Sequence, residues 1–375
     1  MNRRFILFLL LFGPTAAFAW GPEGHRLITL NGIRALPLTM SRFREADFHL
    51  ADRSFDVDRR KLKDEEVVYR EFIQLERYPE ALAGRMPSTK LELEKRYGKD
   101  AVRLNGTLPY HILDLIDSLH GTMKNADWPM TLAVISDLGY YVSELSNPLR
   151  VTMNYDGQYT HNNGIRWRYE NELMNRYYPQ MMLRRLDPPK FADPKAEPFA
   201  RIMNLALKSQ SRLVNILRRD TMAFRIAKNS YSSTYYSTMW KELGPSMTEL
   251  VQESVDLYAA LIYNVWLEAG GTKIPWRDQY ARRSLPAAEP EHLGQNYPNP
   301  FTGRTTIPYV LKENANIRLA VYTVFGQELM LLMEGRQGPG QFEAQFNAEH
   351  LSDGTYFVRL QIDDRTEVRK MILAK

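Results

Sequence analysis

The sequence contains no cysteine, only seven histidines, and no long uninterrupted apolar stretch after residue 19. The absence of cysteine excludes disulfide bonds, zinc–thiolate sites and thiol redox chemistry. Stability must therefore come from burial of apolar side chains, for which a chain of 375 residues has ample material. No later segment reaches the roughly 18 to 20 apolar residues that a membrane-spanning helix requires, so we expect no transmembrane segment.

The chain also lacks a strong excess of one charge. Its formal net charge is +5 at pH 7. Residues 1–19 contain Arg3 and Arg4 but no acidic residue, so their removal would leave a net charge of +3. A balance this mild does not by itself indicate a nucleic-acid-binding protein.

Residues 1–19 have the pattern of a cleavable secretory signal peptide. Two arginines precede a short apolar run over residues 5–12, and the segment ends with Ala17-Phe18-Ala19, an A-x-A cleavage pattern. We expect cleavage before Trp20, which would free the α-amino group of that residue. Because the apolar run is too short to span a bilayer, the sequence predicts an exported, soluble protein.

Hydrophobic periodicity indicates a helical domain over residues 20–275. Apolar residues recur there at spacings of three and four, for example in residues 113–116 and 255–265. Residues 276–293 contain Pro286 and Pro290 among small and charged residues, which is typical of a linker.

Over residues 294–375 the period changes from helical to strand-like. Residues 317–322 and 356–362 alternate in polarity and are rich in β-branched and aromatic residues, and Asp353-Gly354 is a turn signal. The predicted fold is therefore mainly α, with a small all-β sandwich of immunoglobulin-like type at the C-terminus.

Several ordered motifs occur within residues 20–170. They are WGPEGH (20–25), GTLP (106–109), LGYYV (138–142), NPL (147–149), NYDGQ (154–158) and GIRWRYE (164–170). Over residues 20–270 this pattern resembles the zinc-dependent phospholipase C and single-strand-specific nuclease superfamily. The resemblance implies a mostly helical domain with three zinc ions that hydrolyses phosphodiesters, because adjacent metals acidify a bridging water and neutralise the charge of the transition state.

Four residues of this sequence match ligand positions of that family. The resemblance places Trp20, His25 and Asp58 at the metals, with the freed Trp20 amine and its carbonyl among the ligands. Glu170 stands where a late carboxylate is expected.

The remaining ligand positions depart from the family. Glu71 and Tyr140 stand where the family has histidine, and Glu144 stands where it has a bridging aspartate. Arg150 and Arg166 each replace a ligating histidine. Four imidazoles that the zinc chemistry uses are therefore missing.

The two arginines argue against a metal at the position they share with Glu170. Arginine cannot be deprotonated to become a ligand. A divalent ion about 4 Å from a guanidinium would be opposed by about 8 kcal/mol even at an effective dielectric constant of about 20. Arg150 and Arg166 then replace the charge of the ion, and Arg166 can pair with Glu170 four residues later. The alternative is that both arginines clamp a phosphate or carboxylate.

Two further ligand sets remain open. Trp20, His25 and Glu144 can hold a single zinc ion. The other set consists of Asp58, Glu71, Tyr140 and Glu144. Its oxygen-rich composition favours a hard ion such as calcium, magnesium or manganese. Alternatively, this set binds no metal, and the Tyr140 hydroxyl donates a hydrogen bond to Glu144 or Glu71.

The C-terminal region carries a resemblance of its own. Its motifs are NYPNPF (296–301), IRLAVY (317–322), FGQE (325–328), DGTYFVRL (353–360) and RKM (369–371). Over residues 294–375 they resemble the C-terminal sorting domain of the type IX secretion system. This implies that the secretion machinery is a partner, and that the protein crosses the outer membrane and is then released or kept on the cell surface.

Three hypotheses about function follow. The leading one is a secreted or cell-surface pseudoenzyme with the phospholipase C/nuclease fold and a degenerate zinc site. The second is an active phosphodiester hydrolase with one or two ions, in which Asp58, Glu144, Arg150 and Arg166 are catalytic. The third is a module that binds anionic lipid or nucleic acid through Arg150, Arg166 and Arg168. The sequence selects neither phospholipid nor nucleic acid as ligand and does not fix the oligomeric state.

Overall fold

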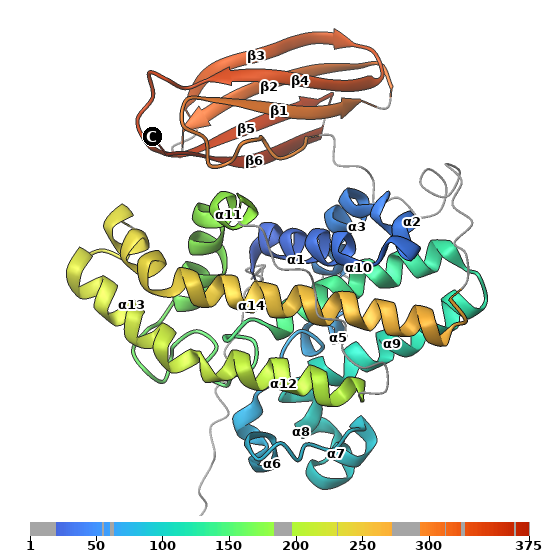
Figure 1. Cartoon of the computed structure of the whole chain (residues 1–375). Coiled ribbons are helices and arrows are strands. Elements are labelled where there is room, and N and C mark those ends of the chain that lie inside the picture. The colour runs from blue at the N-terminus through green and yellow to red at the C-terminus, as the bar shows by residue number, and fades with distance from the viewer. Residues whose placement is uncertain are drawn as a thin grey trace, which may run out of the picture. The chain divides into compact units, whose positions relative to one another are not determined.

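The computed structural model describes most of the chain. The described residues are 20–54, 56–60, 64–183, 197–230, 232–271, 293–311, 313–323, 327–363 and 365–374. The chain divides into two compact units, Met1–Leu285 and Pro286–Lys375 (Figure 1). This division falls within the predicted linker at 276–293, of which only Leu293 is described. The predicted signal peptide, residues 1–19, lies outside the described residues.

The first unit is helical, as predicted. Its α-helices are α1 (Gly21–Ala35), α2 (Ser41–Arg44), α3 (Asp47–Arg53), α4 (Asp56–Arg60), α5 (Glu66–Tyr69), α6 (Pro79–Leu82), α7 (Lys90–Tyr97), α8 (Lys99–Leu104), α9 (Leu108–Lys124), α10 (Trp128–Leu145), α11 (Met174–Leu183), α12 (Pro198–Ser211), α13 (Leu213–Ala227) and α14 (Ser233–Glu268). Short 3-10 turns are η1 (Leu38–Met40) and η2 (Leu75–Arg77), and η3 (Trp167–Leu173) is a π-helix. Among the helices described, none is long and apolar enough to cross a membrane.

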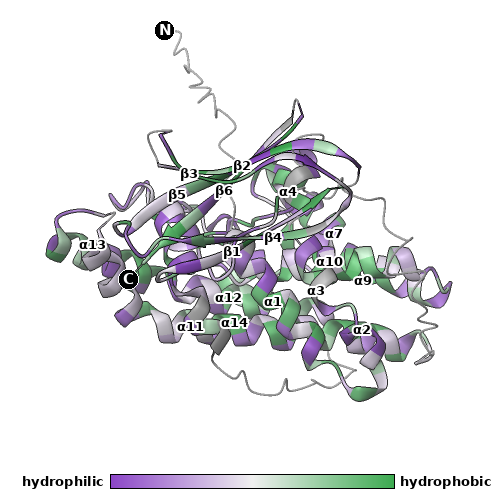
Figure 2. Cartoon of the chain, turned by 90° about the horizontal axis from the view of Figure 1, so that it is seen from above, coloured by the Kyte–Doolittle hydropathy of each residue, from purple (hydrophilic) through white to green (hydrophobic). Residues whose placement is uncertain are grey.

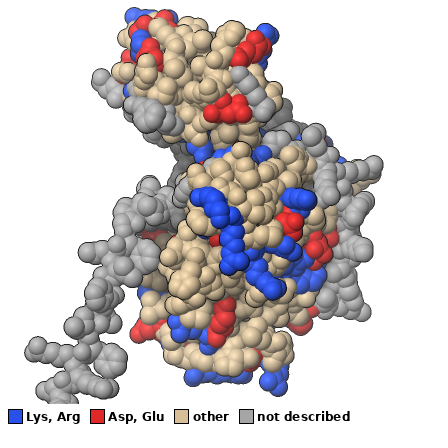
Figure 3. Space-filling view, turned by 90° about the vertical axis from the view of Figure 1, so that its left-hand side faces the viewer, with Lys and Arg blue, Asp and Glu red and all other residues tan. Residues whose placement is uncertain are grey.

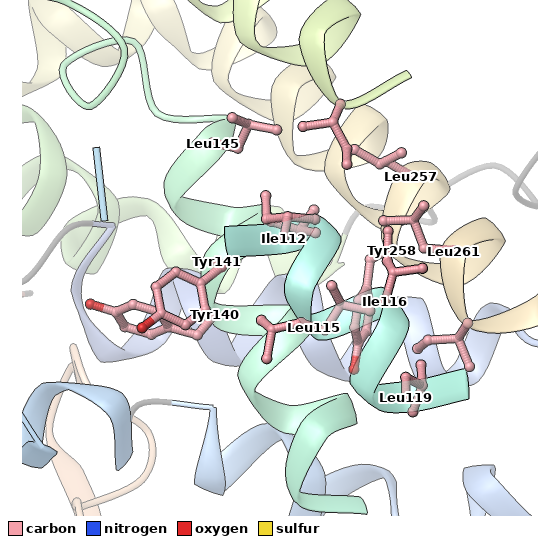
Figure 4. Close-up of a cluster of buried hydrophobic side chains, with 14 of the residues drawn as sticks. Ile112, Leu115, Ile116, Leu119, Tyr140, Tyr141, Leu145, Leu257, Tyr258 and Leu261 are labelled. Atoms are coloured by element: carbon pink, nitrogen blue, oxygen red, sulfur yellow. The ribbon is translucent and has the colours of Figure 1, made fainter. Parts of the chain in front are cut away.

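The centre of this unit is formed by α9, α10 and α14. Figure 4 shows side chains of α9, including Ile112 and Leu115, packed together with tyrosines and leucines of α10 and α14. The buried Tyr258 of α14 donates a hydrogen bond to the carbonyl of Ile135 in α10 at 2.9 Å. In Figure 2 polar and apolar colours both run along most helices, as expected where one face is buried and the other exposed.

Two glycines bring α1 into close contact with its neighbours. A Cβ atom at Gly139 of α10 would lie 2.4 Å from the hydroxyl oxygen of Thr29 in α1. A Cβ atom at Gly32 of α1 would lie 2.2 Å from the ring of Tyr258. Glycine is required at both positions because a side chain would force the helices apart. The N-terminal helix is therefore held directly against α10, which carries Tyr140 and Glu144 of the candidate site.

The ends of α10 follow from its sequence. The Asp127 side chain caps the helix by accepting a hydrogen bond from the Met130 amide at 3.2 Å, and a proline occupies the first turn. The helix ends before Asn147-Pro148, as expected for a residue that precedes proline. The backbone then turns, with the Arg150 amide donating to the Asn147 carbonyl at 2.9 Å. This turn carries Arg150 back toward the end of α10.

The second unit is a two-sheet β domain, which confirms the predicted C-terminal sandwich. Its strands are β1 (Arg304–Leu311), β2 (Ala315–Thr323), β3 (Glu328–Gln337), β4 (Gly340–Asn347), β5 (Gly354–Ile362) and β6 (Arg365–Leu373). One sheet pairs β1 with β4, and the other has the order β3-β2-β5-β6, with every pair antiparallel. Alternate residues such as Leu319, Val321 and Leu360 are buried between the sheets.

Candidate functional site

Five elements of the helical unit bring the predicted ligand positions together. Helix α1 supplies His25, α10 supplies Tyr140 and Glu144, the segment after α5 supplies Glu71, and the turn after α10 supplies Arg150. The π-helix η3 supplies Glu170, with Arg166 as the residue before its first turn. π-Helical turns are rare and are frequently found at functional sites. We call these seven residues the Arg150 cluster.

The guanidinium of Arg150 is surrounded by three carboxylates. Its Nε lies 2.8 Å from Glu144 Oε2 and 3.9 Å from Glu170 Oε1. Its Nη1 lies 3.8 Å from Glu71 Oε2. All four side chains are almost fully buried, with 6% of Arg150 exposed and at most 2% of each carboxylate. Burial disfavours the charged guanidinium, but the three carboxylates outweigh burial and raise the pKa of Arg150.

Tyr140 and Glu71 are joined directly. The Tyr140 hydroxyl donates a hydrogen bond to Glu71 Oε1 at 3.0 Å. Of the two acceptors considered from the sequence, the structure thus contains the contact with Glu71. These are two of the positions at which the resemblance predicts histidine, and here they form a hydrogen-bonded polar pair.

His25 is held by α10 on both sides of its ring. Its Nδ1 is hydrogen bonded to Ser143 Oγ, and its Nε2 lies 3.3 Å from Glu144 Oε1. Since the Ser143 hydroxyl donates to the Tyr140 carbonyl at 2.6 Å, Nδ1 must be the donor to Ser143. The imidazole also stacks on Tyr140, with ring centroids 4.3 Å apart. The ring is therefore fixed with Nε2 facing the Glu144 carboxylate.

Arg166 closes the other side of the cluster. Its Nε donates to Glu170 Oε2 at 3.2 Å, so the predicted pairing of these two residues is present. Its side chain is 22% exposed, whereas that of Glu170 is fully buried. Burial raises the pKa of Glu170, and the nearby Arg150 and Arg166 oppose that effect.

Trp20 is completely buried beside the end of α10. Its indole Nε1 donates to Ser146 Oγ at 3.2 Å, and its ring lies 5.5 Å from that of Tyr169 between centroids. The Trp20 carbonyl accepts a hydrogen bond from the Gly24 amide at 3.1 Å and so belongs to the first turn of α1. The predicted ligand oxygen of Trp20 therefore accepts the first hydrogen bond of α1.

Two further predicted residues, besides Trp20, have no described contact with the Arg150 cluster. Asp58 belongs to α4, but its side chain lies outside what the structure describes. Arg168 is buried elsewhere, in a group with Asp220, Tyr235 and two backbone carbonyls. Its guanidinium is therefore committed to internal partners.

The serines that hold His25 and Trp20 were not identified from the sequence. Ser143 and Ser146 flank Glu144 at a spacing of three, so they share a helix face directed at α1. The sequence feature that could have identified them is the presence of two serines next to the predicted ligand Glu144. They position the candidate ligands by hydrogen bonds to the imidazole and the indole.

The resemblance implies a centre of three metal ions. Among the described side chains, no three histidines or carboxylates are arranged to hold a metal ion. The oxygen atoms of Glu144 and Glu170 that would bind metal instead face the guanidinium of Arg150. The 3.3 Å between His25 Nε2 and Glu144 Oε1 is close to the separation of about 3.3 Å between two ligands of tetrahedral zinc. The described side chains thus fit at most one ion, at His25 and Glu144, and do not fit three.

Comparisons with known proteins give one family match and several similar structures. Residues 295–374 match the model of a secretion system C-terminal sorting domain. An alpha-toxin from Clostridium absonum has a TM-score of 0.42 and 8% sequence identity, covering 97% of this chain and 98% of that chain. An alpha-toxin from an avian strain of Clostridium perfringens has a TM-score of 0.41 and 8% identity, covering 96% and 100%. A comparison with curated sequences finds no match.

The family match and the β-sandwich agree on the C-terminal unit. The matched residues include all six strands, β1 to β6. The chain therefore ends in a secretion system C-terminal sorting domain, and it is a protein exported by the type IX secretion system.

Proposed function

We propose that the helical unit is a non-hydrolytic relative of the zinc-dependent phospholipases C and nucleases, displayed or released outside the cell. The observation that carries this proposal is the position of Arg150 among Glu71, Glu144 and Glu170. A fixed cation within the carboxylates supplies the charge that metal ions supply in an active site. It cannot supply a metal-bound water, which is the nucleophile of that chemistry.

The burial of the cluster supports the same proposal. A phosphodiester would have to reach the carboxylates and the imidazole, yet the side chains of His25, Glu144 and Glu170 have no exposed surface. Arg150 is engaged by carboxylates and so does not present its guanidinium to a phosphate. Arg166, at 22% exposure, is the most exposed side chain of these ion pairs. The cluster then acts as an internal link between α1, α10 and η3.

The test uses protein exported and processed so that Trp20 is its first residue. Metal content is measured by elemental analysis, and hydrolysis is measured on single-stranded DNA, on phosphatidylcholine and on a chromogenic phosphodiester. We expect no stoichiometric metal and no hydrolysis that a chelator removes. Hydrolysis that disappears both on chelation and in Glu144→Ala would overturn the proposal.

A matched variant separates loss of function from a poorly folded sample. Glu172 lies on the same π-helix, but its carboxylate pairs with Arg176 outside the cluster, at 3.6 Å. Glu172→Ala therefore removes a carboxylate without changing the Arg150 cluster. If an active wild type loses activity in Glu144→Ala and keeps it in Glu172→Ala, the hydrolase hypothesis is correct. An N-terminal extension ahead of Trp20 that also abolishes activity would assign the surviving ion to the Trp20 amine.

A further inference from the structure

The C-terminal end of α13 exposes large apolar side chains together with cations. Phe224 and Ile226 are 51% and 57% exposed. Arg225 lies between them in sequence and Lys228 follows the last residue of the helix, while Arg218 lies seven residues before Arg225; all three are exposed. We call these five residues the α13 tip.

The positive charge of the α13 tip is not neutralised within the described part of the chain. There, Arg218, Arg225 and Lys228 form no ion pair. The nearest acidic groups on α13 and α14 have other partners, since Asp220 pairs with Arg168 at 2.9 Å and Glu242 pairs with Arg219 at 2.9 Å. Figure 3 views the chain from the side on which α13 lies in Figure 1, and Lys and Arg side chains gather on that face of the helical unit.

The α13 tip is mounted on a firmly packed helix. Other positions of α13 are buried, among them Ile216, Leu217 and Ala223. Lys228 ends the helix in the left-handed conformation, and its amide donates to the Phe224 carbonyl at 2.8 Å. The exposed side chains are thus presented by a rigid element, which lowers the entropic cost of binding.

The composition of the α13 tip favours a lipid surface over a protein partner. Two apolar side chains offer far less than the roughly 800 Å² per partner of a stable protein interface. A membrane surface requires only a few apolar side chains at the headgroup boundary, together with cations that attract anionic lipids. One phenylalanine gives little stacking for the bases of single-stranded nucleic acid, which normally needs several aromatic side chains.

We propose that the α13 tip docks the exported protein on an anionic lipid surface, with Phe224 and Ile226 inserted between headgroups and the three cations against lipid phosphates. This inference does not depend on the chemistry of the Arg150 cluster. A failure of one proposal is therefore distinguishable from a failure of the other.

The experiment is co-sedimentation of the full chain beginning at Trp20 with vesicles. Vesicles that contain phosphatidylglycerol are compared with vesicles of phosphatidylcholine alone, at low and high salt. We expect binding to the anionic vesicles only, and weaker binding at high salt. Each cation contributes about 1 kcal/mol, so Arg225→Ser and Lys228→Ser should each weaken binding about fivefold.

Matched variants remove equivalent groups from elsewhere on the helical unit. Phe224→Ser combined with Ile226→Ser should reduce binding at least tenfold. Leu38→Ser with Leu91→Ser removes apolar side chains that are 78% and 62% exposed, and should leave binding unchanged. Thermal unfolding of each variant checks that it is folded.

Three outcomes would overturn the proposal. The first is equal binding to both kinds of vesicle. The second is binding by the Phe224/Ile226 variant that matches the wild type. The third is tight, salt-sensitive binding of a single-stranded oligonucleotide that the α13 tip variants lose while vesicle binding stays absent, which would assign the surface to nucleic acid.

Discussion

Two buried arginines of the helical unit have different surroundings. Arg168 meets one carboxylate, Asp220, and donates to neutral oxygens of Tyr235, Asn162 and Asn163 at 2.8 to 3.2 Å. Arg150 meets three carboxylates, two of them at 3.8 and 3.9 Å. Burial lowers the pKa of both guanidiniums, and the facing groups reverse that effect.

The difference indicates what each arginine does. Around Arg168, directional hydrogen bonds to carbonyls tie the 162–163 turn to α13 and α14, so the geometry suits a guanidinium in particular. Around Arg150 three acidic groups surround one positive charge, Glu144 at 2.8 Å and Glu71 and Glu170 at 3.8 and 3.9 Å. This difference supports the proposal that in the Arg150 cluster a side chain takes the place of a bound cation.

The largest effect should come from Arg150→Ala. This change leaves three buried carboxylates without their central cation, and breaking a buried pair costs about 3–5 kcal/mol. We expect a loss of stability at or above the upper end of that range in urea unfolding. Arg150→Lys, which keeps the charge, should lose clearly less. Equal losses for the two variants would contradict the interpretation that charge is what matters.

Added divalent cations should stabilise a variant of Arg150 but not a variant of Arg168. In Arg150→Ala the emptied cluster of carboxylates should bind calcium or manganese, and saturation at 100 times the dissociation constant would restore about 2.7 kcal/mol. Arg168→Met should lose about 3 kcal/mol and regain nothing, because only Asp220 remains there. The measurement is the melting temperature of each variant against cation concentration. If cations raise the melting temperature of both variants, or of neither, the proposed difference between Arg150 and Arg168 is wrong.

A moderate effect is expected for Tyr140→Phe. This change removes the hydrogen bond to the Glu71 carboxylate, and hydrogen bonds to charged groups contribute about 1.5–3 kcal/mol. Tyr258→Phe is the matched control, because it removes a buried hydrogen bond to the neutral carbonyl of Ile135, worth about 1 kcal/mol. Chemical denaturation should rank Tyr140→Phe as the more damaging change.

The smallest effect is a pH dependence that arises from Glu170. Its pKa is raised in the folded state above the ordinary value of 4.5, so the folded protein holds this proton more tightly than the unfolded chain. The contribution of Glu170 to stability is then fully present below pH 4.5 and is lost as the pH rises through the folded pKa, by at most about 1.4 kcal/mol per pH unit. The stability of Glu170→Gln relative to wild type, measured by urea unfolding across pH, should therefore increase over that window.

The two-domain organisation could be predicted because periodicity reports burial locally. Residues 317–322 and 356–362 fall within β2 and β5, and the helix end before Pro148 was set by backbone sterics. The Arg166–Glu170 contact was also predictable, since its partners are four residues apart. The π-helical winding of that segment was not, because it depends on how η3 packs.

Contacts between segments that are distant in the chain could not be predicted from the sequence. The partner of Arg168 is 52 residues away, so the sequence left it available as a ligand-binding residue. The hydrogen bond between His25 and Ser143 depends on the close packing of α1 on α10 at Gly139. A motif identifies which side chains occupy ligand positions, but only packing decides what those side chains face.

The last strand of the sorting domain has a consequence for the order of events during export. Strand β6 pairs along its whole length with β5, and Met371 and Leu373 are buried in the sandwich core. The Phe301 amide donates to the Ile372 carbonyl, and the Ala374 amide donates to the Phe301 carbonyl, both at 2.9 Å. The sandwich can therefore close only after residues 371–374 have been synthesised. A truncation before Met371 is expected to leave the sorting domain unfinished.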